Sequence, residues 1–382
     1  MFRLLIGHSD DPDTAAAAAE IIAHCKGALA GGQARGGMLF AAIDHDHALL
    51  LAAIHDAFPG LALIGCTTDG ELSSQHSFSE GSIVLALFVG DAVRAAVGLG
   101  RGINKDPTGA SARAIAEARQ ALGVPPVICC ITPDGLTIRA NAMLASLRAA
   151  LPNGVPVVGG TAADDWRFTG TQQFCGREVV RDALPVLLLG GGLQVAHSFA
   201  SGWQPIGLAE SVTLSRGYAV QRIGERTAIE FYRHYLGDTM LPSGEHPLAV
   251  HDPDGGFYLR APQSHDLQTG SIRFAAEIPA GSRVQLTAAS RDDILSATHT
   301  AVSAARRGFT GEPSAALVFS CAARKQLLGT RTSEEYTRLR AELGDLPVAG
   351  FYGYGEFVPL GSDRSCSYHN ETVVVVLLGD VP

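Results

Sequence analysis

Apolar and polar residues recur in the same order three times along the chain. Amphipathic stretches with apolar positions three and four residues apart predict helices over residues 13–29, 47–58, 107–122, 138–151, 290–307 and 334–343. Short apolar runs bounded by Gly, Pro or Asp predict the intervening strands: residues 38–43, 61–67 and 81–89, then 126–132, 155–161 and 184–189, then 315–320, 347–351 and 372–378. Each copy reads helix, strand, helix, glycine-bearing strand, linker strand and very apolar strand.

This recurrence predicts an α/β fold in which mixed β-sheets with flanking helices are built from three similar α-β-α-β-β-β units. A β-rich connector, residues 194–289, separates the second unit from the third, and within it we expect a hairpin over residues 211–223 and an amphipathic helix over residues 228–236. The Pro/Gly/Ser/His stretch over residues 241–247 resembles a linker. We therefore divide the chain near it into an N-terminal region, residues 1–237, and a C-terminal region, residues 238–382.

Composition narrows the classes of function. The chain has 382 residues, of which 46% are hydrophobic and 18% charged, so it can bury large cores. A net charge of −9 and the absence of any Lys/Arg run longer than two residues argue against a nucleic-acid partner. No run of about 18 apolar residues and no basic leader is present, so we expect a cytoplasmic protein without membrane insertion.

Cysteine usage points away from disulfides and structural zinc. The seven cysteines are an odd number and include no C-x-x-C pair. Most lie inside apolar strands, where a thiol usually serves as a small buried hydrophobe. Cys321 and Cys366 are the exceptions, because both stand beside polar residues.

Polar residues follow equivalent strands in the three units. Asp44, Asp134 and Cys321 come at the same strand end, and polar segments at residues 66–69, 161–165 and 352–356 follow each glycine-bearing strand. Ligands of open α/β sheets collect at the carboxyl ends of strands. The third unit has the densest polar chemistry.

We therefore predict a ligand site in the C-terminal region. It is lined by residues that leave or enter neighbouring strands, with Asp164 or Trp203 closing it from the N-terminal side: Cys321, Arg324, Tyr352, Glu356, His369 and Asn370. The Arg324 guanidinium can pair with a carboxylate or phosphate through two hydrogen bonds, and Glu356 suits an amine. The structural alternative is a buried ion pair between Arg324 and Glu356, which would support the fold without contacting a ligand.

At these residues the chain resembles the FIST family. The resemblance rests on six motifs that occur in the family's order: Ile64-Gly-Cys-Thr-Thr-Asp-Gly-Glu71, Val158-Gly-Gly-Thr-Ala-Ala-Asp164, Gly202-Trp-Gln-Pro205, Phe319-Ser-Cys-Ala-Ala-Arg324, Gly350-Phe-Tyr-Gly-Tyr-Gly-Glu356 and His369-Asn370-x-Thr372. They extend over nearly the whole chain.

The resemblance implies a non-enzymatic bacterial sensor that binds a small ligand, amino-acid-like or another small metabolite. It implies signalling to a separate output protein, such as a histidine kinase or a diguanylate cyclase, because this chain carries no output domain of its own. We expect no cofactor. Some stand-alone relatives are linked to haem and nitric-oxide sensing, which gives the alternative of a haem or iron–sulfur sensor with His369, Cys321, Cys366 or Tyr352 as ligands.

A third class is a thiol-dependent hydrolase. Cys321, His369 and Asn370 have the residue types of a nucleophile, a base and an orienting amide. A reactive thiol also needs a lowered pKa, to which Arg324 could contribute. The sequence has no Walker-type loop, which argues against nucleotide-driven work. Sensor, metalloprotein and hydrolase remain open from the sequence.

Overall fold

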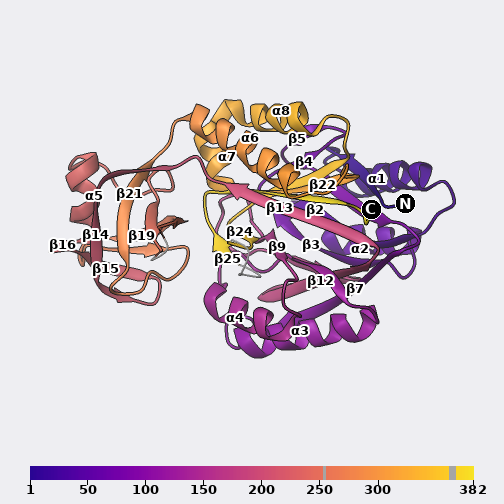
Figure 1. Cartoon of the computed structure of the whole chain (residues 1–382), viewed down its shortest axis with the longest axis horizontal. Helices are drawn as coiled ribbons and strands as arrows, with labels where there is room; N and C mark the ends of the chain where they lie inside the picture. The colour runs from indigo at the N-terminus through magenta and orange to yellow at the C-terminus, as the bar shows by residue number, and fades with distance from the viewer. Residues whose placement is uncertain (253–254, 361–366) are drawn as a thin grey trace.

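The computed structural model describes residues 1–252, 255–360 and 367–382. It has a large body of three mixed sheets with helices outside them and a smaller β-rich body, residues 204–288 (Figure 1). The two chain ends lie near each other in the large body, where the backbone N–H of Phe2 donates to the Asp380 carboxylate at 2.9 Å. None of the helices in the described residues is long and apolar enough to cross a membrane.

The first two units share one order of elements. The first consists of β1 (Arg3–Ser9), α1 (Thr14–Leu29), β2 (Ala34–Ala42), α2 (His47–Ala57), β3 (Ala62–Thr68), β4 (Glu71–Ser73), β5 (Ser77–Ser79) and β6 (Ile83–Val89). The second consists of β7 (Val93–Arg101), α3 (Pro107–Leu122), β8 (Pro126–Ile131), α4 (Ala140–Ala150), β9 (Val157–Gly160), β10 (Gln173–Cys175), β11 (Glu178–Val180) and β12 (Ala183–Gly191). Asp13, Asp46 and Asp106 accept backbone N–H bonds as N-caps of α1, α2 and α3.

The third unit repeats this order with two insertions. It consists of β13 (Leu193–Ala200), α6 (Arg291–Arg307), β22 (Ala315–Cys321), α7 (Ala322–Leu328), a 3₁₀ turn (Gly329–Arg331), α8 (Thr332–Leu343), β23 (Val348–Gly353), β24 (Glu356–Val358), β25 (Ser367–His369) and β26 (Val373–Asp380). The short helix α7 precedes α8, and the small body is inserted between β13 and α6.

The three sheets exchange hairpins in a cycle. Hairpin β4–β5 of the first unit pairs with β23 of the third, β10–β11 of the second pairs with β3 of the first, and β24–β25 of the third pairs with β9 of the second. The sheet orders are accordingly β1-β6-β2-β3-β10-β11, β7-β12-β8-β9-β24-β25 and β13-β26-β22-β23-β4-β5. Each unit thus supplies the edge of its neighbour's sheet.

One apolar cluster joins the inner faces of the three sheets. Phe40 packs on Phe351 and Phe319, with ring centroids 4.7 and 6.5 Å apart. Strands β6, β12 and β26 are buried along nearly their whole length, which explains their continuous apolar sequences. Helix pairs cover the outer faces, so the polar strand ends are the places left for a site.

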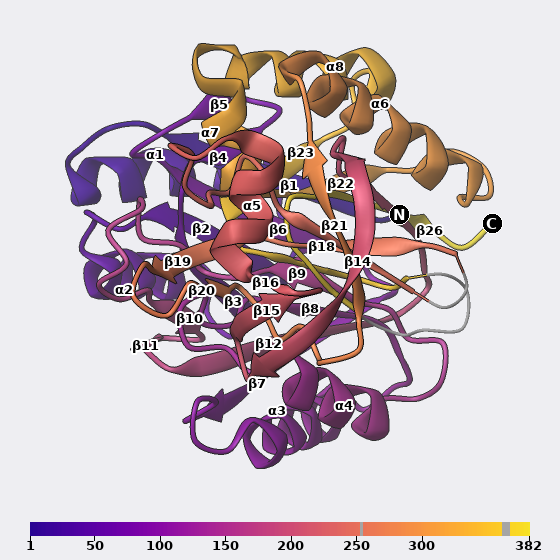
Figure 2. The same cartoon turned by 90° about the vertical axis from the view of Figure 1, so that its left-hand side faces the viewer.

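The small body is an eight-stranded sheet with one helix. Its elements are β14 (Gln204–Arg216), β15 (Ala219–Ile223), β16 (Arg226–Thr227), α5 (Ala228–Leu236), β17 (Leu248–His251), β18 (Phe257–Arg260), β19 (Pro262–Asp266), β20 (Ser271–Phe274) and β21 (Arg283–Ala288). Thr227 and Glu230 form a capping box that starts α5. In Figure 2 this body lies in front of the large body.

The predicted α/β class, the mixed sheets, the three units and the β-rich connector are confirmed. The prediction missed β7 and β13, which precede the first helices of the second and third units, the helix α7, and the hairpin form of the linker strands. It also assigned residues 194–200 to the connector, whereas these residues form most of β13 and pair with β26. Sheets of the large body combine strands from both sides of residue 237.

Candidate functional site

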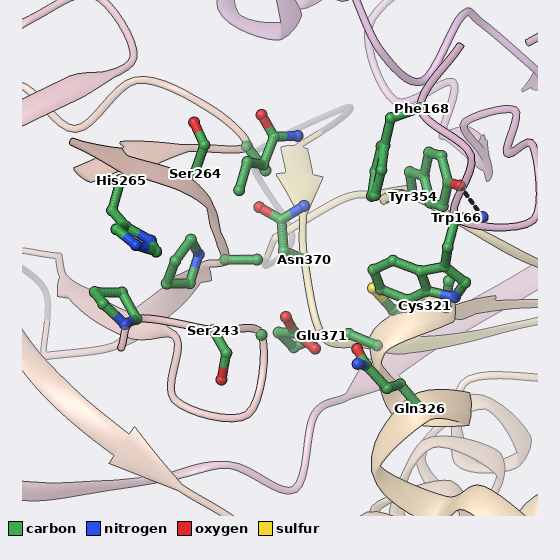
Figure 3. Close-up of a pocket in the computed structure, with 18 residues that line it drawn as sticks. Trp166, Phe168, Ser243, Ser264, His265, Cys321, Gln326, Tyr354, Asn370 and Glu371 are labelled. Atoms are coloured by element: carbon green, nitrogen blue, oxygen red, sulfur yellow. Dashed lines mark hydrogen bonds between the residues drawn. The ribbon is translucent and has the colours of Figure 1, made fainter. Parts of the chain in front are cut away.

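A cavity of about 490 Å³, here called the interbody cavity, lies where the small body meets the third unit. The small body contributes the 242–244 segment and the start of β19, including Ser264 and His265 (Figure 3). The large body contributes Cys321 and Gln326 from β22 and α7, and Tyr354 after β23. Asn370 and Glu371, which precede β26, lie between the two sides in Figure 3.

Three aromatic rings form one wall of the cavity. The ring centroids of Trp166, Phe168 and Tyr354 lie 5.3 to 5.7 Å from one another. Trp166 is 37% exposed and Phe168 55% exposed, although aromatic side chains of this size are usually covered. This group, here called the aromatic trio, offers an open apolar face to the cavity.

Asp164 holds the loop that carries two of these rings. Its carboxylate accepts backbone N–H bonds from Phe168, Thr169 and Gly170 at 2.8 to 3.1 Å and the Tyr354 hydroxyl bond at 2.8 Å. Although burial opposes ionisation, these donors lower the pKa of Asp164. Trp166 and Phe168 have φ of 56° and 49°, in the left-handed region that non-glycine residues rarely adopt. The backbone is therefore held in a costly conformation that exposes both rings.

Glu371 is buried beside this wall without a partner. Its side chain has no exposed surface, and neither carboxyl oxygen has a hydrogen-bond partner among the described residues. Burial, and then the nearby Glu356, raise the pKa of Glu371 well above its ordinary value. A Cβ placed on Gly244 would lie 3.7 Å from its Oε1, so the 242–244 segment covers the carboxyl group.

The equivalent turns in the other units do not use a buried acid in the place of Glu371. Gly81 stands two residues before the apolar strand β6, Asp182 one residue before β12, and Glu371 two residues before β26. Their φ angles are 68°, 49° and 61°. Glycine adopts this conformation without strain at the first position. Asp182 is half-buried and accepts the Asn104 N–H at 2.8 Å. Only the third unit buries an unpaired acid there.

Glu356 belongs to a bond that the three units share. Its Oε2 accepts the Thr372 N–H at 3.3 Å, as Glu71 accepts that of Ser82 and Gln173 that of Ala183, each at 3.3 Å. The three side chains occupy the same register, opposite Gly160, Phe351 and Cys66. Burial raises the pKa of Glu356 to about 8 and that of Glu71 to about 7. Since Gln173 makes the same bond, the position is primarily architectural.

The Cys321 thiol is protonated in this environment. It ends β22, begins α7 and is 4% exposed. Burial, followed by Glu356 and Glu371, raises the pKa of Cys321 well above its ordinary value. A thiolate is therefore disfavoured at this place.

The structure does not bring Arg324 and Tyr352 to the cavity. Arg324 is fully buried and forms an ion pair with Glu335 of α8, and it also donates to the Ile294 carbonyl at 3.0 Å. The Tyr352 hydroxyl donates to the same Glu335 at 2.6 Å. Although burial opposes ionisation, Arg324 lowers the pKa of Glu335. The predicted anchor is a buried structural cation, and the expected alternative pairing with Glu356 is also wrong, because Glu335 is the partner.

The remaining predicted residues are dispersed. Asn370 lines the interbody cavity, whereas His369 borders a different cavity of about 230 Å³. Trp203 is buried at the junction of the bodies, and its Nε1–H donates to the Glu245 carbonyl at 3.0 Å, which supports the 242–244 segment from behind. Cys366 lies outside the described residues.

The nucleophile and base predicted for a hydrolase do not lie in one cavity. The His369 ring is buried against Phe199, Nε2 faces the Val358 carbonyl at 3.3 Å, and burial lowers the pKa of His369 to about 3. It borders another cavity than Cys321, so the pair does not form a nucleophile and base. Cys321 and His369 also do not share a cavity as haem ligands, and Cys366 lies outside the described residues, so the haem or iron–sulfur alternative stays a prediction.

The first unit has an equivalent polar edge that is already filled. The first-unit rim comprises Asp69, Glu80, Gly81 and the incoming Lys325 of α7, around a cavity of about 120 Å³. The Lys325 ammonium lies 3.3 Å from Asp69 and 2.7 Å from Glu80. Counting from Gly65 and Gly350, Asp69 corresponds to Tyr354. Counting from the turn residues Gly81 and Glu371, Glu80 corresponds to Asn370. A lysine of the protein thus occupies the place that stays open in the third unit.

Sequence reasoning missed Trp166, Phe168 and Glu371. Trp166 and Phe168 follow Asp164, which was identified, and two aromatic residues in a polar loop were a usable signal. Glu371 stands between two predicted motif residues, and its alignment with Gly81 was available from the repeat. Its burial without a partner could not be read from the sequence.

Comparisons with known proteins identify the type of chain. The family model described as FIST N domain matches residues 36–226, and the model described as FIST C domain matches residues 228–359. An uncharacterized protein of Mycobacterium tuberculosis is 29% identical over 410 residues, which cover 99% of this chain and 100% of that protein. An uncharacterized protein of Mycobacterium bovis is 25% identical over 407 residues, which cover 99% of each.

Among solved structures, a cyanuric acid hydrolase from A. caulinodans aligns over 100% of both chains with 9% identity and a TM-score of 0.40. A second cyanuric acid hydrolase structure aligns over 99% of this chain with 8% identity and a TM-score of 0.39. Similarity of this extent does not bear on function.

Proposed function

The chain belongs to the FIST family, and from this premise we propose that it is a sensory protein that binds a small organic ligand in the interbody cavity. The ligand class that the family resemblance implies is a small metabolite. The receiver of the signal would be a separate output protein, such as a histidine kinase or a diguanylate cyclase. The proposal assigns no catalytic step to the chain.

The observation that carries the proposal is Glu371. A non-glycine residue in the left-handed region costs about 1 kcal/mol or more, and an unpaired buried polar group costs about 1–3 kcal/mol. Glu371 has both features at a turn where the first unit uses Gly81. Local features that cost stability, and that no other contact in the fold offsets, are typical of functional sites.

The cavity has the character of a ligand site. Its volume of about 490 Å³ falls within the range of small-molecule sites, and its walls combine an apolar aromatic face with a few polar groups. The aromatic trio is exposed at the cost of left-handed backbone at Trp166 and Phe168. Two independent local costs therefore converge on one cavity.

The position between two bodies suggests how binding becomes a signal. Hydrogen bonds between the bodies include that of the Tyr218 hydroxyl to the Ile138 carbonyl at 2.8 Å and that of the Arg260 guanidinium to the Tyr368 carbonyl at 3.2 Å. A ligand that contacts both walls favours the orientation in which both contacts form. The small body would then present a changed surface to the output protein.

A ligand-library thermal-shift screen with native mass spectrometry tests the proposal. We expect at least one small ligand to raise the melting temperature of the full chain, and Trp166→Ala to abolish that shift without unfolding the protein. Asp56→Asn, which removes an exposed ion pair with Arg177 away from the cavity, is the matched control and should retain the shift. A ligand that binds equally well to Trp166→Ala and to Glu371→Gln would place the site elsewhere.

A further inference from the structure

The interbody cavity combines an acid with aromatic rings, and this combination restricts its ligand. Glu371 is buried with no hydrogen-bond partner among the described residues, while the aromatic trio presents ring faces within one wall. A cation is attracted both by a carboxylate and by the faces of aromatic rings. An anion would find no positive charge on Glu371 and would gain nothing from the faces of the rings.

The described lining residues offer no cation to an anionic ligand. They include no lysine or arginine; His265 is the one basic side chain among those that the structure describes. Arg324 lies behind the cavity wall, and its charge is already paired with Glu335. A carboxylate or phosphate ligand would therefore lack a partner among these residues.

The first-unit rim shows which group such a place accepts. There the Lys325 ammonium, at the end of a flexible apolar stem, lies between Asp69 and Glu80. The corresponding positions of the third unit are Tyr354 and Asn370, and the acid has moved one residue along the turn to Glu371. The third unit thus keeps an acid but receives no lysine from another unit.

We propose, on the basis of the sensory function above, that the interbody cavity binds an organic ammonium ion. Its apolar body packs on Trp166, Phe168 and Tyr354, and its nitrogen pairs with Glu371. The 242–244 segment covers the carboxyl group and shifts when the nitrogen enters. The ligand is an amine or quaternary ammonium that needs no carboxylate of its own.

Binding of this kind moves one proton. Burial and Glu356 raise the pKa of Glu371, while Arg324 acts to lower it, so the free protein favours the protonated carboxyl group. The neighbouring Cys321 thiol and Tyr232 hydroxyl stay neutral because their pKa values are raised. An ammonium ion pairs with the carboxylate, so the Glu371 carboxyl group releases its proton to solvent. Affinity for an ammonium ion therefore rises with pH, until the amine itself loses its proton.

The experiment is calorimetric titration of the full chain with matched probes. The primary set is phenethylamine, phenylalanine, 2-phenylethanol and 3-phenylpropionate, which share one apolar body and differ in charge; further primary and quaternary amines with aliphatic and aromatic bodies extend it. We expect an amine to bind, its neutral and anionic counterparts to bind at least about tenfold more weakly, and the observed enthalpy to differ between phosphate and Tris because a proton is released.

Glu371→Gln is the test variant, and Asp182→Asn, at the equivalent turn of the second unit, is its control. Loss of about one power of ten or more in amine affinity, together with loss of proton release, is expected for Glu371→Gln only. If no amine binds, or if phenylalanine or 3-phenylpropionate binds more tightly than phenethylamine, the ammonium assignment is wrong. The sensory proposal then still stands if a library ligand of another charge loses its shift in Trp166→Ala, and falls with it if none does.

Discussion

The first-unit rim and the corresponding edge of the third unit share a left-handed turn, but a lysine fills the first and a cavity lies at the third. In the first, Gly81 makes the turn without strain and Lys325 fills the space between two acids. In the third, Glu371 makes the same turn at a cost, and a cavity lies where the lysine would be. The comparison shows that the fold requires the left-handed turn but does not require an acid at that turn.

The same comparison assigns the buried acids to two groups. Glu71 and Glu356 accept the same backbone N–H, so their burial belongs to the repeated architecture. Glu371 has no counterpart with a buried acid in either other unit. A side chain that breaks the repeat is thus a better indicator of function than one that is merely buried and polar.

The largest effect on the free energy of unfolding is expected from a change that loosens α7, because this helix contributes a residue to the first-unit rim and another to the interbody cavity. Arg324→Ala leaves Glu335 buried without its counter-charge and loosens α7, which carries Lys325 to one edge and Gln326 to the other. We expect a loss of about 3–5 kcal/mol in the free energy of unfolding, measured by urea denaturation. A loss below about 1 kcal/mol would mean that α7 is held by other contacts.

Removing the Lys325 ammonium should make the first-unit rim resemble the corresponding edge of the third unit. Lys325→Ala leaves Asp69 buried beside Glu80 without the ammonium, and we expect a loss of about 2 kcal/mol. Burial raises the pKa of Asp69 to about 7 and Lys325 lowers it, so the pKa should rise further in the variant. Addition of ethylamine or propylamine should restore part of the melting temperature of Lys325→Ala and leave that of the unsubstituted protein unchanged.

The shared buried bond predicts pH dependence of the same sign at the two edges. The folded-state pKa of Glu71, about 7, and of Glu356, about 8, exceed their unfolded values, so each group favours folding at low pH. That contribution is lost as pH rises, and the free energy of unfolding should fall by about 1.4 kcal/mol per pH unit per group between about pH 5 and these pKa values.

Glu71→Gln and Glu356→Gln should each flatten this slope, measured by urea denaturation from pH 5 to 9. Gln173 makes the equivalent bond with an amide, so both variants should fold. A steep slope that survives in both variants would assign the titration to other groups, and a slope that responds in only one would end the equivalence of the two edges.

A smaller effect of opposite sign is expected at the turn itself. Glu371→Gly copies Gly81 and removes both the left-handed strain and the unpaired acid, so the free energy of unfolding should rise by about 1–2 kcal/mol while ligand response is lost. Asp182→Gly loses the bond from Asn104 and should gain little. Destabilisation by Glu371→Gly, measured in the same denaturation assay, would show that Glu371 supports the fold.

The smallest effect tests the backbone conformation alone. A Cβ at Gly81 would meet no atom within 4 Å, so Gly81→Ala adds strain without a clash. We expect a loss of about 1 kcal/mol in the free energy of unfolding. No measurable loss would mean that this turn accepts side chains freely, and the strain argument for Glu371 would lose its support.

The sequence predicts the helices and strands of the units well, because interactions between residues close in sequence determine them. It predicts the site only in part, because the site is formed by segments that are distant in sequence. Helix caps and apolar runs act within a few residues, and they locate the helix at residues 228–236 with its first and last residues correct. The strand-end rule points to the third unit and finds Cys321 and Asn370. The ligand-binding role of these residues stays a prediction.

The direction of a side chain is decided by packing between distant segments. Arg324 stands in a motif at a strand end, yet its guanidinium turns towards Glu335 and the Ile294 carbonyl, 30 residues earlier in the chain. The hairpin exchange pairs β4 with β23 across more than 270 residues, and no local pattern encodes it. The same long-range packing positions the 242–244 segment over Glu371, which explains why that residue was missed.

The cyclic exchange of hairpins has a consequence for how the units are joined. A single unit of this kind has an unpaired strand edge and a hairpin without a sheet, so it cannot close on itself. Three copies can exchange their hairpins through one heterologous contact repeated around a threefold axis, which is the geometry of a closed C₃ ring. In this chain β6 leads into β7 and β12 into β13, and the chain ends meet at the third junction, where the Phe2 N–H donates to the Asp380 carboxylate.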